Sequence, residues 1–325
     1  MKLLIFIISL FLLVTYTYSE DEIYVIETEV DGPDECIGEE LYDAKEGVCY
    51  IEAKLDNAVA ALQSEYNDLS ISKLDSSATP NDTLLKDAEA IYTIDTNETF
   101  LLLSGVENNE HKKVKKWLKI ISPNDFSNNY LSRLILMPSN SDNSAAYVGM
   151  SDYGKSGSWD VIVNMTSLRE DGEKEMVFTL IHEYAHILTL NYTQVNENIS
   201  PENCTTYDTI SEGCTEENSY LNQFVQKFWK ELLRKKPNAE NYYDYYDSHS
   251  SEFVRDYAAT NAVEDIAESF AYFVFAKKGT YTTIAEQKIN FFYNYPELVE
   301  MRKNIRNSLK ELVKAEILTN PQEQN

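Results

Sequence analysis

The segment Thr179-Leu-Ile-His182-Glu183-Tyr-Ala-His186-Ile-Leu188 decides which fold and chemistry we expect from this chain. Apolar residues continue on both sides of it and predict a buried helix that begins after residues 171–172 and ends near residue 190. Two histidines four positions apart lie on one face of a helix, so His182 and His186 can both reach a single tetrahedral metal ion. Glu183 lies between them and flanks the open coordination position. The segment therefore predicts a metal site within the core.

The same helix does not supply a third metal ligand. The continuation H-E-x-x-H-x-x-G-x-x-H fails, because the chain has Thr189 in place of the glycine and Tyr192 in place of the histidine. His111 lies in a lysine-rich helix and is expected to be solvated, whereas His249 lies in a serine-rich loop and is a weak candidate. Acidic residues are therefore the better candidates for the third position.

Two glutamates downstream have the spacing that a ligand and its supporting residue would need. Glu264 and Glu268 lie one turn apart on a helix expected over residues 262–278, and the other side of that helix is apolar. Carboxylates beside an apolar helix face are costly to bury unless they bind a metal or a hydrogen-bond donor. A solvated acidic face is the alternative in so acidic a chain. Glu212, in a loop next to Cys214, is a competing ligand candidate.

The two segments together resemble a known family. The H-E-x-x-H motif followed by Tyr257-x6-Glu264-x-x-Ala-Glu268 is similar to the gluzincin metallopeptidases, and its second part resembles the anthrax lethal factor catalytic domain and related secreted Pro-Pro endopeptidases. This resemblance covers about residues 160–190 and 253–275. It implies Glu264 as the third zinc ligand, Tyr257 as the donor that stabilises the transition state, and Glu268 as the residue that orients a ligand histidine.

The same family resemblance keeps one alternative open. Ser211-Glu212-Gly213 resembles the ligand context of aminopeptidase-type gluzincins, in which Glu212 rather than Glu264 would complete the metal site. The spacer between His186 and Glu264 is also longer than in lethal factor. The implied fold is α+β and zincin-like, with a small mixed sheet, an active-site helix and a mostly helical C-terminal subdomain.

The start of the chain and its cysteines predict an exported protein. One lysine, an apolar run of about 12 residues and a small-x-small exit predict a signal peptide over residues 1–19. The four cysteines form two local pairs, so we expect the disulfides Cys36–Cys49 and Cys204–Cys214. Six sequons are compatible with a glycoprotein. A disulfide-containing segment and linker would then occupy residues 20–83, and the metallopeptidase domain residues 84–325.

Composition excludes several other classes. The 28 Lys and Arg against 54 Asp and Glu give a net charge of −26, which disfavours binding to nucleic acid or to an anionic membrane. The chain carries no P-loop, no dinucleotide-binding glycine motif and no G-x-S-x-G elbow. After signal cleavage we expect no stable membrane insertion.

The remaining pattern predicts the order of the elements around these segments. The strand at 159–165 alternates apolar and polar residues, which predicts a half-buried or edge strand. As an antiparallel edge strand it could pair with extended substrate backbone. The Tyr/Asp cluster at 241–247 is expected to be a loop. Helices are expected at 51–66, 84–92, 108–121, 219–235, 284–293 and 296–318, and strands at 131–137 and 145–150.

These expectations combine into one functional hypothesis. A secreted peptidase with one catalytic Zn²⁺ would cleave a protein or peptide substrate, with Glu183 as the general base. The main alternative is a secreted zinc-binding adhesion or binding protein without catalytic activity. A zinc hydrolase that acts on non-peptide amides shares the same chemistry.

Overall fold

The computed structural model describes residues 23–29, 41–43, 48–54, 84–94, 99–139, 144–209, 211–230, 232–235, 242–276 and 282–319. The expected signal peptide and the expected linker before residue 84 lie outside these residues, as does Cys36 of the expected Cys36–Cys49 disulfide. Within the described part, no helix combines the length and the apolar character needed to cross a membrane.

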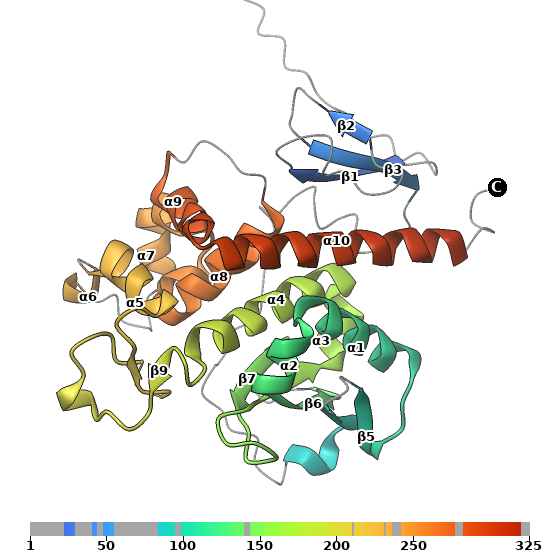
Figure 1. Ribbon diagram of the computed structural model, residues 1–325, viewed down its shortest axis with the longest axis horizontal. Helices are drawn as coiled ribbons and strands as arrows, with labels where there is room; N and C mark the ends of the chain where they lie inside the picture. The colour runs from blue at the N-terminus through green and yellow to red at the C-terminus, as the bar shows by residue number, and fades with distance from the viewer. Residues whose placement is uncertain are drawn as a thin grey trace, which may run out of the picture.

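A mixed five-stranded sheet forms one side of the molecule (Figure 1). Its order is β5-β4-β6-β8-β7, in which β6 and β8 are parallel and every other neighbouring pair is antiparallel. The two parallel strands are buried along their whole length, as expected for the centre of a sheet. The bounds are β4 (Ala90–Ile94), β5 (Phe100–Gly105), β6 (Leu131–Met137), β7 (Ala146–Met150) and β8 (Trp159–Asn164).

The central helix α4 (Glu173–Leu190) packs between this sheet and the helical C-terminal part. It follows the short helix α3 (Met165–Asp171), and Gly172 separates the two with a φ of 90°, a backbone conformation that glycine adopts without steric cost. Every residue of α4 from Met176 to Leu190 is buried. Helices α1 (Asn109–Ile121) and α2 (Asn124–Tyr130) complete this half of the chain.

The second half of the chain is helical, and its central element is α8 (Ala262–Phe275), which packs directly against α4. The long helix α10 (Pro296–Thr319) extends across the molecule in Figure 1. The other elements are α5 (Tyr220–Phe224), the π-helical turn η5 (Val225–Trp229), α6 (Leu232–Lys235), α7 (Tyr242–His249), the short 3-10 turns η7 (Ser250–Glu252) and η8 (Tyr257–Ala259), α9 (Ile284–Phe291) and η9 (Phe292–Asn294).

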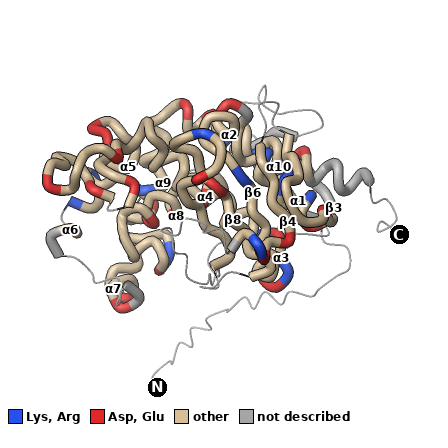
Figure 2. Tube along the Cα trace, turned by 90° about the horizontal axis from the view of Figure 1, so that it is seen from below, with Lys and Arg blue, Asp and Glu red and all other residues tan. Residues whose placement is uncertain are grey.

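A separate three-stranded antiparallel sheet precedes these elements. It contains β1 (Ile23–Glu29), β2 (Leu41–Asp43) and β3 (Val48–Lys54), in the order β1-β3-β2. Strands β1 and β3 contact α10 (Figure 1). Acidic residues are spread over the sheet side and the helical side alike (Figure 2). The architecture is therefore α+β with a mixed sheet, as the sequence predicts.

Three predicted elements are wrong. Residues 51–54 belong to strand β3 rather than to a helix. The helix expected at 84–92 is instead a short 3-10 turn, η3 (Leu84–Asp87), followed by β4, because the apolar residues of this stretch pair with β6. The Tyr/Asp cluster expected to be a loop forms α7.

The prediction of an edge strand at 159–165 is also wrong. Strand β8 lies between β6 and β7, and even its polar Asp160 is buried, because Arg133 on β6 donates hydrogen bonds to that carboxylate. The polar residue that suggested an exposed face is thus half of a buried ion pair. The edge strand on this side of the sheet is β7.

Candidate metal centre

The two histidines of α4 converge on one point. Both side chains are buried, and the Nε2 atoms of His182 and His186 lie 2.9 Å apart. One helical turn between them accounts for this approach. Burial of two imidazoles in an apolar helix needs partners, and these come from the neighbouring helix α8.

Helix α8 supplies the carboxylate. Its N-cap Asn261 accepts hydrogen bonds from the backbone N–H groups of Val263 and Glu264, so the first turn is fixed where the ligand candidate lies. The Oε2 atom of Glu264 lies 3.2 Å from Nε2 of His182 and 3.2 Å from Nε2 of His186. These three residues form the single group in the described part of the chain that could hold a metal ion.

The geometry of this group fits a small divalent cation. A tetrahedral zinc ion binds nitrogen and oxygen at about 2.0–2.1 Å, so neighbouring ligand atoms lie roughly 3.3–3.4 Å apart. The observed separations of 2.9 and 3.2 Å are close to this value. The Oε2 atom of Glu264 is buried and, despite the two nearby imidazoles, accepts no hydrogen bond of acceptable geometry. A buried acceptor without a donor is rare and indicates an ion or ligand site.

The local charge also favours a cation. Burial opposes charge on His182, but the carboxylates of Glu268 and Glu264 raise its pKa to about 10. Burial likewise opposes charge on Glu264, yet the two imidazoles hold the pKa of that carboxyl below its usual range. The centre therefore has a negative potential that would stabilise a bound metal cation.

Glu268 lies behind the first histidine. Its Oε1 atom is 2.8 Å from Nδ1 of His182, so the predicted partner is placed on the far side of the imidazole from the metal group. Arg255 forms a buried ion pair with the same oxygen, and its guanidinium lies 5.0 Å from the centroid of the Phe178 ring. Arg255 is not among the residues that the sequence predicts for this site, because it lies two residues before Tyr257 in a segment without helical periodicity.

The expected general base and the expected hydrogen-bond donor, Glu183 and Tyr257, are both buried near the two imidazoles. Glu183 is buried, which raises the pKa of its carboxyl, while the two imidazoles act in the opposite direction. The Tyr257 ring, in η8, lies 6.0 Å from the His182 ring between centroids. Burial and the neighbouring carboxylates of Glu264 and Glu183 raise the pKa of Tyr257 well above its ordinary value, so its hydroxyl keeps its proton.

The other ligand candidates lie outside this group. His111 is buried rather than solvated, because its Nε2 lies 3.1 Å from Oε2 of Glu89 and 3.0 Å from the Asn108 side chain. His249 stacks on Tyr245 at the end of α7, with 4.1 Å between ring centroids. Glu212 lies in the loop after α4 and lines a cavity there.

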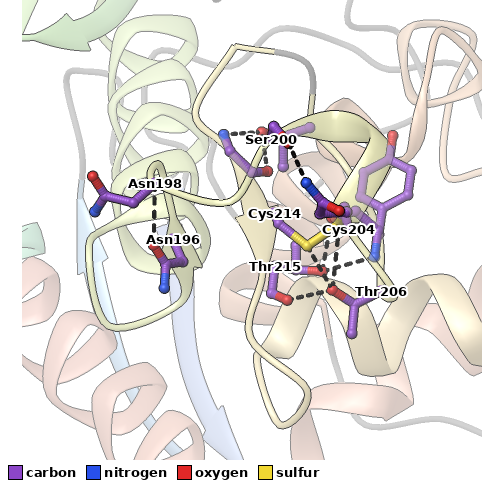
Figure 3. The surroundings of a disulfide bond; sticks show 11 residues. Asn196, Asn198, Ser200, Cys204, Thr206, Cys214 and Thr215 are labelled. Carbon is purple, nitrogen blue, oxygen red and sulfur yellow. Dashed lines mark hydrogen bonds between the residues drawn. A yellow bond between two sulfur atoms is a disulfide. The ribbon is translucent and has the colours of Figure 1, made fainter.

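That loop is closed by the predicted disulfide Cys204–Cys214 (Figure 3). It contains the two-stranded ribbon of β9 (Val195–Asn196) and β10 (Cys214–Thr215). Gly213 has a φ of 121°, and a Cβ atom at this position would lie 2.6 Å from the Asn196 carbonyl oxygen. Only glycine fits such an approach, so the position of Glu212 is set by its neighbour.

Comparisons of the chain with protein-family models, curated proteins and solved structures give no match. The functional argument therefore comes from the residues themselves and from their arrangement.

Proposed function

We propose that the protein is a secreted zinc-dependent peptidase of the gluzincin type, with a zincin-like fold. The observation that carries this proposal is the convergence of two α4 imidazoles and the orphaned Glu264 oxygen beside Glu183. Two nitrogen ligands and one oxygen ligand make the donor set of a catalytic zinc site, which keeps its fourth position open. A structural site would instead fill all four positions with protein ligands.

The chain's own residues then perform the proton transfers. When bound, zinc supplies Lewis acidity and lowers the pKa of a coordinated water to about 7. Glu183 takes the proton of the water that attacks the scissile carbonyl and later gives it to the leaving amine. Tyr257 donates a hydrogen bond to the oxyanion that develops on that carbonyl, an interaction worth about 3 kcal/mol in comparable sites. Glu268 holds His182 so that Nε2 points toward the metal.

An extended substrate would pair with β7. This strand takes the place expected of residues 159–165, since it is the outermost described strand of the sheet next to β8 and contacts α4. Backbone pairing of this kind binds a peptide in extended form and is typical of strand addition at a sheet edge. Cleavage within loops and tails of proteins would follow from this geometry.

The extracellular location rests on the signal-like segment at residues 1–19 and on the Cys204–Cys214 disulfide. Disulfides form and persist mainly in oxidising compartments.

Replacing Glu183 with Gln tests the proposal. We expect the variant to bind one zinc ion per chain and to lose cleavage of a random peptide library, because the amide cannot take a proton from water. Metal content is measured by elemental analysis, and cleavage by mass spectrometry with and without a chelator. Glu170→Gln is the matched control, since Glu170 is exposed on α3, and it should cleave normally.

Two results would contradict the proposal. Full activity of Glu183→Gln would show that Glu183 is not the general base. Stoichiometric zinc in the unsubstituted protein without cleavage of any library peptide would favour the zinc-binding adhesion or binding protein instead.

A further inference from the structure

A cavity of about 450 Å³ lies at the end of α4, where Leu190 lines it. Met150 at the end of β7 and Trp159 at the start of β8 form part of its wall, together with Leu190, one turn after His186. The charges of His186 and Glu264 both act on the carboxyl of Glu212, which lines the cavity on the side of the disulfide loop. The cavity therefore adjoins the proposed reaction centre.

The cavity combines an apolar wall with a strongly acidic one. Glu197, Glu212 and Glu216 line it, and among its described lining residues none is Lys, Arg or His. The ion pairs of the described part of the chain do not include these three carboxylates. Glu212 is half-buried, whereas Glu197 and Glu216 are exposed. Carboxylates gathered on one cavity without an opposite charge give it a negative potential, so a positive ligand would be stabilised here.

The spread of these carboxylates distinguishes between kinds of cation. A divalent ion needs ligand atoms that converge, and within the described residues such a cluster is formed only by His182, His186 and Glu264. The oxygens of the three cavity glutamates therefore do not meet at one point. An elongated organic cation, with an apolar stem and a charged end, matches this arrangement better than a metal ion does.

Tyr192 adds an aromatic surface at the opening. Its side chain is 58% exposed, and its ring lies 5.3 Å from that of Tyr130 between centroids. Gly157 allows this placement, since a Cβ atom there would lie 3.3 Å from Cδ1 of Tyr192. An exposed aromatic face next to carboxylates is suited to a guanidinium or ammonium group.

We propose that this acidic cavity binds an arginine or lysine side chain of the substrate and so sets the sequence preference of the enzyme. The inference rests on the proposed peptidase function. The side chain's methylene groups would lie against Met150 and Leu190, and its charged end would lie among the glutamates. The overall charge of −26 would add long-range attraction for basic peptides.

Glu212 is positioned for this role by its loop. Thr209 Oγ1 accepts hydrogen bonds from the backbone N–H groups of Glu212 and Gly213, at 3.1 and 2.9 Å, and donates one to the Gly213 carbonyl at 2.9 Å. The Cys204–Cys214 disulfide joins the ends of the same loop (Figure 3). A carboxylate on an ordered loop binds a cation with a smaller loss of backbone conformational entropy.

The test compares peptides that differ in charge but not in shape. Two libraries of fluorescent peptides carry, at each position in turn, either arginine or its neutral isostere citrulline. We expect kcat/KM to be at least tenfold higher for arginine at one position, and this ratio to fall to about one in Glu212→Gln and Glu216→Gln. Glu202→Gln is the control, because Glu202 is exposed on the same loop and does not line the cavity; it should keep the full ratio.

A binding measurement separates this inference from the proposed function. Fluorescence anisotropy with the same peptides and the Glu183→Gln protein needs no turnover. If binding is arginine-selective and depends on Glu212 while the unsubstituted, zinc-loaded protein cleaves no peptide, the cavity is supported and the peptidase is overturned. Cleavage with equal rates for arginine and citrulline, or with a preference unaffected by both cavity substitutions, would overturn the cavity and leave the peptidase standing. Unchanged melting temperatures of the variants would show that each one is folded.

Discussion

The two sides of α8 carry buried carboxylates with opposite surroundings. On the side that faces away from α4, Oδ2 of Asp265 lies 2.6 Å from Nζ of Lys288 and accepts a 2.6 Å hydrogen bond from the indole of Trp229, while Ser269 donates to Oδ1. On the side that faces α4, Oε2 of Glu264 accepts no such bond. The hydrogen bonding of the Asp265 carboxylate is therefore satisfied, whereas that of the adjacent Glu264 carboxylate is incomplete.

This difference distinguishes a carboxylate that stabilises the packing of α8 from one that belongs to the candidate metal group. Burial raises the pKa of Asp265 to about 6 even though Lys288 acts against it, and the partners of Asp265 complete its hydrogen bonding. For Glu264, burial also raises the pKa but the imidazoles lower it further, so the carboxylate stays charged with an acceptor to spare. A buried carboxylate oxygen that lies between two imidazoles but accepts no well-formed hydrogen bond indicates a position that a bound ion would fill.

The largest expected effect comes from Glu264→Gln. Apparent zinc-binding free energies of about 10–16 kcal/mol, shared among a few ligands, imply that losing one ligand costs about 4 kcal/mol, or roughly a thousandfold in affinity. Competition with a chromophoric chelator measures the zinc dissociation constant. Asp265→Asn, on the other side of the helix, is the control and should keep zinc affinity within a few fold.

The same titration decides between the two acidic ligand candidates. If Glu264→Gln kept its zinc affinity and Glu212→Gln lost it, the third ligand would lie in the disulfide loop. The distinction between the two sides of α8 would then fail.

The second effect concerns the satisfied side. Lys288→Met leaves Asp265 buried without its cation, and removing one partner of a buried ion pair costs about 3 kcal/mol or more. We expect the free energy of unfolding in urea to fall by that amount. Because the two groups are fully buried, the double variant Lys288→Met/Asp265→Asn should recover much of the loss. A double variant as unstable as the single one would show that the lysine stabilises α8 through its packing on Phe253, whose ring centroid lies 3.9 Å away, and not through charge.

The residues of the candidate metal group could be predicted from the sequence more fully than the residues that hold them in place. His182, Glu183 and His186 follow from spacing within one helix, and Glu264 and Glu268 follow from a second helix of regular pattern. Arg255 and Lys288 come from irregular or distant segments, and their roles depend on how α8 packs. No local pattern encodes that packing, so pairwise tertiary contacts were needed to find them.

The errors in the fold have a related cause. A short alternating run such as Trp159–Asn164 indicates a half-exposed strand only if its polar residue faces water. Here Asp160 faces Arg133, a residue on another strand. The helix prediction for 84–92 was wrong because a short apolar run does not distinguish a helix from a strand. Here residues 90–93 pair with β6 and form a strand.

Arg255→Met should have a smaller effect on the same metal group. Arg255 does not lie in the metal group but fixes Glu268, which in turn orients His182. Loss of such an outer partner typically weakens metal binding by about 10–100-fold. Arg255→Lys keeps the charge and should recover part of the affinity, whereas a uniform loss in both variants, together with a lower melting temperature, would indicate a purely structural role.

The smallest expected effect is a pH dependence at the start of α9, the helix that carries Lys288. Glu286 accepts hydrogen bonds from the backbone N–H groups of Thr282 and Thr283, at 2.6 and 2.8 Å, and completes a capping box with Thr283. These bonds lower the pKa of Glu286 to about 2. A carboxyl whose pKa is lower in the folded state contributes stability above its unfolded value, near 4.5, and loses that contribution as the pH falls toward 2.

Glu286→Gln should therefore lower the melting temperature slightly at pH 7, and the difference from the unsubstituted protein should shrink between pH 4.5 and pH 2. The metal-free protein is used at each pH, so that zinc release does not enter the difference. Glu300→Gln removes a charge from an exposed position on α10 and should show no comparable change over this range. A difference between Glu286→Gln and the unsubstituted protein that stayed constant down to pH 2 would mean that the capping hydrogen bonds do not depend on the ionised carboxylate. The charge of Glu286 at the start of α9 would then make no contribution to the stability of the side of α8 that contacts Lys288.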